Sequence, residues 1–173
     1  NGLDQAAIAE LAEAPNGDLF LTGTFKGSSA SFLGATIPFH GNPASPCFFL
    51  ASITQSGSLN WFSSFSDNNI AIADIDVDRF GNCYFVGTVT GAVTLGGMTV
   101  VANSGNGNVL AGKMDPHGSP VWIISTQNAN SDEDILAMDC SVDNRVLLSG
   151  SLNSGSGTLG GIPYTASMFS SIV

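Results

Sequence analysis

Three aspartates at alternate positions, Asp74, Asp76 and Asp78, have the residue type and spacing that suit metal binding. Alternate residues of an extended strand point to the same face, with about 6.6 Å between successive side chains. Carboxylates arranged in this way could share a hard cation through their oxygen atoms. We therefore predict calcium as the one cofactor candidate, at Asp74, Asp76 and Asp78. The alternative is that the strand binds no cofactor, because the corresponding stretches elsewhere in the chain do not repeat the cluster.

A second acidic group, Asp132-Glu133-Asp134, is either another calcium candidate or a solvated connection between strands. The residues that could support hydrolysis do not form a recognisable arrangement. His40 and His117 are the two histidines, and each lies beside a glycine in an expected turn. Ser156 lies between two glycines, but a nucleophilic serine of this type needs a strand that leads into a helix, which the sequence does not predict. We therefore expect no catalytic residues and no enzyme activity.

The three cysteines, Cys47, Cys83 and Cys140, lack the close spacing of metal ligands, and an odd number cannot pair completely within one chain. Each lies in an apolar segment, where a small thiol packs well. We expect buried free thiols. A disulfide between Cys83 and Cys140 is the alternative.

The charge balance of the chain limits its partners. Its 173 residues include 4 Lys and Arg against 14 Asp and Glu, which gives a formal net charge of -10. This charge repels nucleic-acid phosphates over a Debye length of about 8 Å, so nucleic acid is not an expected partner. Only 10% of the residues are charged, so Ser, Thr, Asn and Gly must form much of the surface, as in many exported proteins. No run of about 18 apolar residues occurs, so no membrane-spanning helix is predicted.

The chain repeats one plan three times, over residues 6–69, 70–134 and 135–173, and the third copy is truncated. A glycine at the end of an apolar segment recurs at intervals of 64 and then 63 residues, at Gly23, Gly87 and Gly150. Repeats of this length, built from short apolar segments and glycine turns, indicate stacked or radially arranged sheets. We therefore expect a single all-β domain over residues 1–173.

Each complete copy is expected to hold four antiparallel strands. In the second copy, residues 70–78 alternate between two faces as a strand does, and a turn at residues 80–82 leads into a second strand from Cys83. The polar stretch after the second strand varies in length between copies, which is typical of a surface ribbon or loop rather than a core strand. The fourth strand carries Trp61 or Trp122, and we expect both to pack between neighbouring sheets.

Seven residues of the second copy form a recognisable signature: Gly87, Gly96, Gly97, Lys113, Asp115, Gly118 and Trp122. Together with the order of the segments, they resemble the bacterial β-propeller repeat of the SBBP type, over nearly the whole chain. The first copy departs from the signature, with Ser52 in place of Lys113 and Thr54 in place of Asp115. The resemblance implies propeller blades of four antiparallel strands, about two and a half of them in an incomplete ring. It also implies a secreted or cell-surface bacterial protein of a family with no common catalytic activity.

A closed propeller needs about 4–8 blades, so two and a half blades leave sheet edges open to other strands. We expect either that the native polypeptide continues beyond Val173 into further blades, or that several copies combine into a ring or fibre. The expected function is a non-catalytic structural or binding module, outside the cell or on its surface. Its expected partners are other blades of the same polypeptide, further copies of itself, or a surface glycan or protein. The alternatives are a self-assembling subunit of an extracellular filament and a glycan-binding or glycan-degrading protein.

Overall fold

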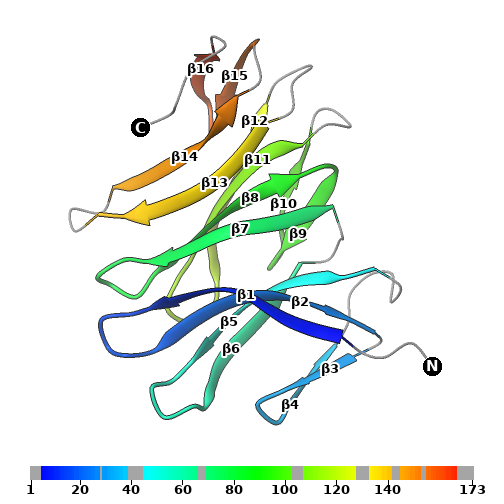
Figure 1. Ribbon diagram of the computed structural model, residues 1–173, viewed down its shortest axis with the longest axis vertical. Coiled ribbons are helices and arrows are strands. Elements are labelled where there is room, and N and C mark those ends of the chain that lie inside the picture. Colours follow the sequence, from blue (N-terminus) through cyan, green and yellow to red (C-terminus); the bar gives the residue numbers. More distant parts are fainter. Residues whose placement is uncertain are drawn as a thin grey trace.

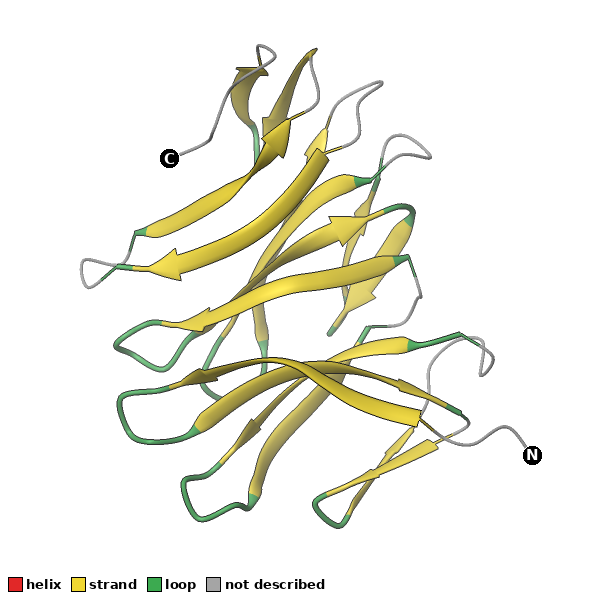
Figure 2. Ribbon diagram, viewed as in Figure 1, coloured by secondary structure: helices red, strands yellow, loops and turns green. Residues whose placement is uncertain are grey.

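The computed structural model describes residues 5–27, 29–38, 45–65, 69–102, 107–127, 133–141, 145–152 and 155–166. All the regular structure in these ranges is β-strand, and the strands pair antiparallel (Figure 2). The predicted all-β class is therefore confirmed. Three features of the sequence analysis lie outside the described residues: His40, Asp132 and the end of the chain from residue 167.

The first two copies each form a four-stranded sheet, as the sequence predicts. The first sheet has the strand order β1-β2-β5-β6 and contains β1 (Gln5–Glu13), β2 (Leu19–Lys26), β5 (Cys47–Ile53) and β6 (Leu59–Ser64). The second repeats this order with β7 (Ile70–Val77), β8 (Cys83–Val89), β11 (Asn108–Met114) and β12 (Pro120–Gln127). Figure 1 shows the two sheets following one another along the long axis of the molecule.

A short hairpin is inserted between the second and third strands of each of these sheets. The hairpins are β3 (Ser29–Phe32) with β4 (Ala35–Pro38), and β9 (Ala92–Leu95) with β10 (Met98–Val101). The expectation of a surface ribbon is only half right, because Val93 and Leu95 are fully buried and belong to the core. Val93 and Leu95 alternate with Ala92 and Thr94, which are less buried, so one face of the hairpin packs inward.

The third copy begins with a strand pair, β13 (Glu133–Cys140) and β14 (Val146–Leu152), which we call the third sheet. Its hairpin, β15 (Gly155–Leu159) with β16 (Ile162–Ala166), joins the outer strand β12 of the second sheet, through Thr126 opposite Leu159. This pairing joins different copies of the repeat and was not predicted from the sequence, and it covers part of an otherwise open strand edge. The described residues close neither a barrel nor a ring.

Two apolar clusters hold the successive sheets together. Between the first and second sheets, Phe65 packs edge-to-face against Phe85, with ring centroids 5.7 Å apart. Trp61 belongs to this cluster, and Trp122 belongs to the cluster between the second and third sheets, where it contacts Tyr84. The prediction that both tryptophans pack between neighbouring sheets is therefore confirmed. A third cluster lies on the outer side of the first sheet, under the β3–β4 hairpin.

The recurring glycines allow two strand backbones to approach each other closely. The inner strand of each copy has a register shift at the same place, between Ile8 and Glu10, Ile72 and Asp74, and Ile135 and Ala137. The glycine on the paired strand approaches this irregularity closely. A Cβ atom would lie 2.0 Å from the Ala7 carbonyl oxygen at Gly23, and 2.0 Å from that of Ala71 at Gly87. Only a residue without a side chain fits there.

Candidate functional site

The carboxylate of Asp74 joins the second sheet to the third. One of its oxygens accepts a hydrogen bond from the Ile75 amide in its own strand, at 2.8 Å. The other accepts one from the Met138 amide in β13, at 2.7 Å. A single side chain therefore holds the inner strands of two successive copies side by side.

Asp76 repeats the arrangement two residues later. Its two oxygens accept hydrogen bonds from the amides of Val77, at 2.7 Å, and Cys140, at 2.6 Å. Hydrogen bonds to a charged acceptor are stronger than those between neutral groups, and each contributes about 1.5–3 kcal/mol. We call the pair Asp74 and Asp76 the carboxylate bridge.

The bridged amides occupy equivalent positions in their copies. Ile75 and Met138 each pair with the residue that lies two positions before the recurring glycine. The carboxylate bridge therefore connects Ile75 and Val77 of one inner strand with their counterparts in the next, Met138 and Cys140. This is a repeat-to-repeat contact and needs no residue outside the two strands.

Only the second copy carries both aspartates of the bridge. By strand register, the corresponding residues are Glu10 and Ala12 in β1, and Ala137 and Asp139 in β13. Alanine has no acceptor, so the first sheet cannot make the same pair of contacts with the second. The joint between these sheets is instead filled by the larger apolar cluster around Phe65.

Asp78 lies apart from the bridge, in the turn between β7 and β8, and only 3% of its surface is exposed. Its carboxylate accepts hydrogen bonds from the Phe80 amide at 2.9 Å, and from the backbone and side-chain amides of Asn82 at 2.9 and 2.8 Å. The Tyr84 hydroxyl donates a further bond at 3.3 Å, and the Lys113 ammonium group lies 3.8 Å away. Asp78 therefore closes the turn and ties it to the neighbouring strands.

These contacts determine the ionisation of Asp78. Burial alone would raise the pKa of its carboxyl group, since it disfavours the charged form. The hydrogen bonds from Asn82 and Phe80 and the charge of Lys113 act in the opposite direction, and together they lower the pKa below its usual value. The folded protein thus stabilises the ionised form of Asp78.

The structure gives the three aspartates of the predicted metal site different roles. Asp74 and Asp76 bind backbone amides across the joint, and Asp78 binds amides within a turn. Among the described residues, no group of three or more His, Cys, Asp or Glu side chains is arranged to hold a metal ion. Calcium binding at Asp74, Asp76 and Asp78 stays a prediction, and the ion would have to replace these hydrogen bonds.

The two described residues of the second acidic group differ in burial. Glu133 begins β13 and is 3% exposed, whereas Asp134 is exposed. The Thr126 hydroxyl donates to the Glu133 carboxylate, and the Asn108 side chain donates to the Thr126 carbonyl at 2.9 Å. The Glu133 amide also donates to the Gly107 carbonyl at 2.9 Å. This polar cluster fixes the start of the third sheet to the end of β12.

None of the three cysteines forms a disulfide in the structure, so the alternative pairing of Cys83 with Cys140 is absent. Cys47 and Cys83 are buried, and Cys140 is half-buried. Burial raises the pKa of Cys83 far above its usual value. Burial, together with the negative charge of Asp76, raises the pKa of Cys140 to about 12. The thiols of Cys83 and Cys140 are therefore protonated and poorly reactive at neutral pH.

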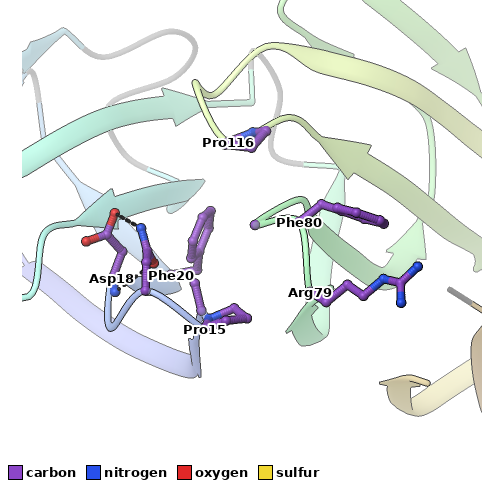
Figure 3. Close-up of a pocket in the computed structure, with 9 residues that line it drawn as sticks. Pro15, Asp18, Phe20, Arg79, Phe80 and Pro116 are labelled. Atoms are coloured by element: carbon purple, nitrogen blue, oxygen red, sulfur yellow. Dashed lines mark hydrogen bonds between the residues drawn. The ribbon is translucent and has the colours of Figure 1, made fainter. Parts of the chain in front are cut away.

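A cleft of about 190 Å³ lies where the turns of the first and second sheets meet. We call it the turn cleft. Figure 3 shows Pro15, Asp18 and Phe20 on the side of the first sheet, and Arg79 and Phe80 on the side of the second. Across the same joint, the indole nitrogen of Trp61 donates to the Pro116 carbonyl at 3.0 Å, and Pro116 also lines the cleft.

The rim of the turn cleft carries an exposed aromatic ring. Phe80 is 59% exposed, and the Arg79 guanidinium lies over its ring, 4.7 Å from the centroid. A flat apolar ring beside a charged group can contact both the apolar face and the hydroxyl groups of a sugar, or a protein side chain. The cleft itself is smaller than the roughly 300 Å³ of a typical small-molecule pocket. The rim and cleft therefore suit a shallow contact.

The remaining candidate residues lie on separate elements. His117 is exposed in the turn between β11 and β12, where its backbone amide donates to Asp115 at 2.9 Å. Ser156 lies in the hairpin strand β15 and is also exposed. Within the described ranges, no helical segment has the length and hydropathy that crossing a bilayer requires.

A comparison of the chain with protein-family models gives no match, and a comparison with curated proteins gives none either.

Proposed function

We propose that the chain is a non-catalytic scaffold of the propeller type, part of an exported bacterial protein that acts outside the cell or on its surface. The observation that carries this proposal is the carboxylate bridge, because it uses the chain's most prominent acidic residues to join successive sheets. Two four-stranded antiparallel sheets with the same strand order, followed by the start of a third, support an arrangement as successive blades. The resemblance to the SBBP repeat supports the location.

The scaffold would present its turns to a partner. The turn cleft and the exposed Phe80 ring lie at one end of the sheets, on connections between strands, which is where scaffolds of this kind commonly carry binding residues. The net charge of -10 favours a neutral or cationic partner over an anionic one. We propose a surface glycan or a protein as the partner of this region.

Binding to an immobilised panel of neutral oligosaccharides tests this role. The expected result is retention of at least one oligosaccharide by the unmodified chain and its loss in Phe80→Ala, which removes the exposed ring. Val101→Ala is the matched control, because Val101 is similarly exposed but lies on the β9–β10 hairpin. Binding that is equal in all three proteins would contradict a role of the Phe80 rim. Release of p-nitrophenol from chromogenic glycosides by the purified chain would contradict the non-catalytic assignment.

A second candidate function, self-assembly into a larger structure, is favoured by a separate observation. The outer faces of the first and third sheets expose apolar residues at positions that are buried where two sheets meet within the chain.

A further inference from the structure

On the inner strand of the first sheet, apolar residues are exposed at positions that are buried in the second and third sheets. Ile72 in the second sheet and Ile135 in the third occupy one equivalent position, opposite the recurring glycine, and they are 8% and 5% exposed. The equivalent residue of the first sheet, Ile8, is 53% exposed. Leu11 behaves in the same way, at 58% exposure. We call this open side of the first sheet the receiving face.

The receiving face is hollowed. A cavity of about 210 Å³ opens beside Ile8, and its other large residues are Phe25, Phe32, Phe49 and Phe62. By strand register, Phe25 and Phe49 correspond to Val89 and Leu110 of the second sheet. Those two residues are buried in the cluster that the first sheet completes with Phe20 and Phe65. The equivalent surface of the second sheet is therefore filled by a neighbouring sheet. In the first sheet, Phe25 and Phe49 are each 2% exposed, within the cluster under the β3–β4 hairpin, so the open part of the receiving face is its β1 side, with Ile8 and Leu11.

The third sheet has an open side that corresponds to the side with which the first and second sheets contact the next sheet. Phe20 of the first sheet packs toward the second, and Tyr84 of the second sheet packs toward the third. The equivalent residue of the third sheet is Leu147, which is 39% exposed. It lies directly opposite Asp139, the counterpart of Asp76, in the register of β13 and β14. We call this open side of the third sheet the inserting face.

We propose that the inserting face of one chain docks on the receiving face of a second copy, in a head-to-tail contact that repeats the joints within the chain. The partner of the scaffold is then a second copy of the same chain. This inference rests on the proposed scaffold function only in treating each sheet as one repeated unit. Leu147 would fill the apolar surface beside Ile8. Asp139 would accept the amide of Glu13, the counterpart of Cys140. A contact between two different faces propagates into a ring or a filament.

The negative charge of each copy opposes this contact, so the salt concentration affects how strongly the copies associate. Each copy has a formal net charge of -10, and the Glu13 side chain would lie near the Asp139 carboxylate of the next copy. Salt screens such repulsion, since the Debye length falls from about 10 Å at 0.1 M to about 3 Å at 1 M. The association should therefore strengthen as the salt concentration rises.

The mass of the chain in solution, measured by light scattering at rising protein and sodium chloride concentrations, tests the proposal. We expect masses of several times 17.7 kDa for the unmodified chain. Ile8→Asp removes the receiving face and Leu147→Asp removes the inserting face, so each variant alone should stay at the mass of one chain. An equimolar mixture of the two should form a dimer and nothing larger, because one intact face of each kind remains. Val101→Asp is the control, since Val101 is 54% exposed, close to the 53% of Ile8, but lies on neither face.

Two results would overturn the proposal. One is an unmodified chain that keeps the mass of a single chain under all these conditions. The other is that Ile8→Asp or Leu147→Asp assembles alone, or that their mixture stays monomeric while Val101→Asp assembles. The mixture also controls for folding, because a variant that had unfolded could not restore the dimer. The outcome is independent of glycan binding, so the failure of either proposal can be told from the failure of the other.

Discussion

A carboxylate has two oxygen atoms, so one aspartate can accept hydrogen bonds from two backbone segments. Asp74 and Asp76 use this capacity where an inner strand would otherwise present unpaired amides. Their alternating positions were visible in the sequence, and spacing alone suggested a shared cation. The partner amides lie 64 residues further along the chain, so no local pattern could show that the carboxylates serve a joint.

Asp78 leads to a prediction about pH. Because its pKa is lowered in the folded protein, the ionised group contributes stability at pH values above the ordinary carboxyl pKa of about 4. This contribution is lost as the pH falls through the folded-state pKa. In Asp78→Asn the contribution is absent at every pH. We therefore expect the unmodified chain to exceed the variant in free energy of unfolding at about pH 6, and the difference to shrink toward about pH 3.

Urea unfolding at several pH values, followed by tryptophan fluorescence, measures this difference. Asp134→Asn is the control, since Asp134 is an exposed carboxylate, and its difference from the unmodified chain should stay small throughout. A gap between the unmodified chain and Asp78→Asn that stays constant or widens as the pH falls would contradict the role given to Asp78.

At the scale of elements, the four-stranded plan could be predicted because alternating side chains and glycine turns are local signals. The position of the β15–β16 hairpin could not, since its pairing with β12 depends on an edge that belongs to another copy. The burial of Val93 was also missed, because a short polar insertion resembles a surface loop in its composition. The glycines were seen as markers of strand ends, whereas the structure places Gly87 inside β8, against the backbone of β7.

Substitution of this glycine tests the close approach. In Gly87→Ala the new Cβ would meet the Ala71 carbonyl oxygen at 2.0 Å, and a backbone atom in a sheet cannot move aside easily. We expect a loss of about 3 kcal/mol in the free energy of unfolding, measured by urea titration. In Gly107→Ala the nearest atom would lie at 3.6 Å, so this control should change stability by less than about 0.5 kcal/mol. Equal effects of the two substitutions would show that the approach is not tight.

At the scale of the whole molecule, successive sheets are joined by two different means. The first joint relies on a large apolar cluster, and the second combines a smaller cluster with the carboxylate bridge. Figure 1 shows the result as a series of sheets in one direction, with the first and third sheets at its ends. The two end faces carry residues at the strand positions that meet in the joints within the chain, and this equivalence underlies the proposed head-to-tail assembly.

Carboxylates of the second sheet hold the inner strand of the third, and hydrogen exchange of single backbone amides tests this contact. The measurement compares Met138 and Cys140 with Leu11 and Glu13, their counterparts in β1, at a protein concentration where the mass is that of one chain. We predict that Met138 and Cys140 exchange at least about tenfold more slowly, because a hydrogen bond to a charged acceptor must first open. Equal exchange rates at all four amides would contradict the account.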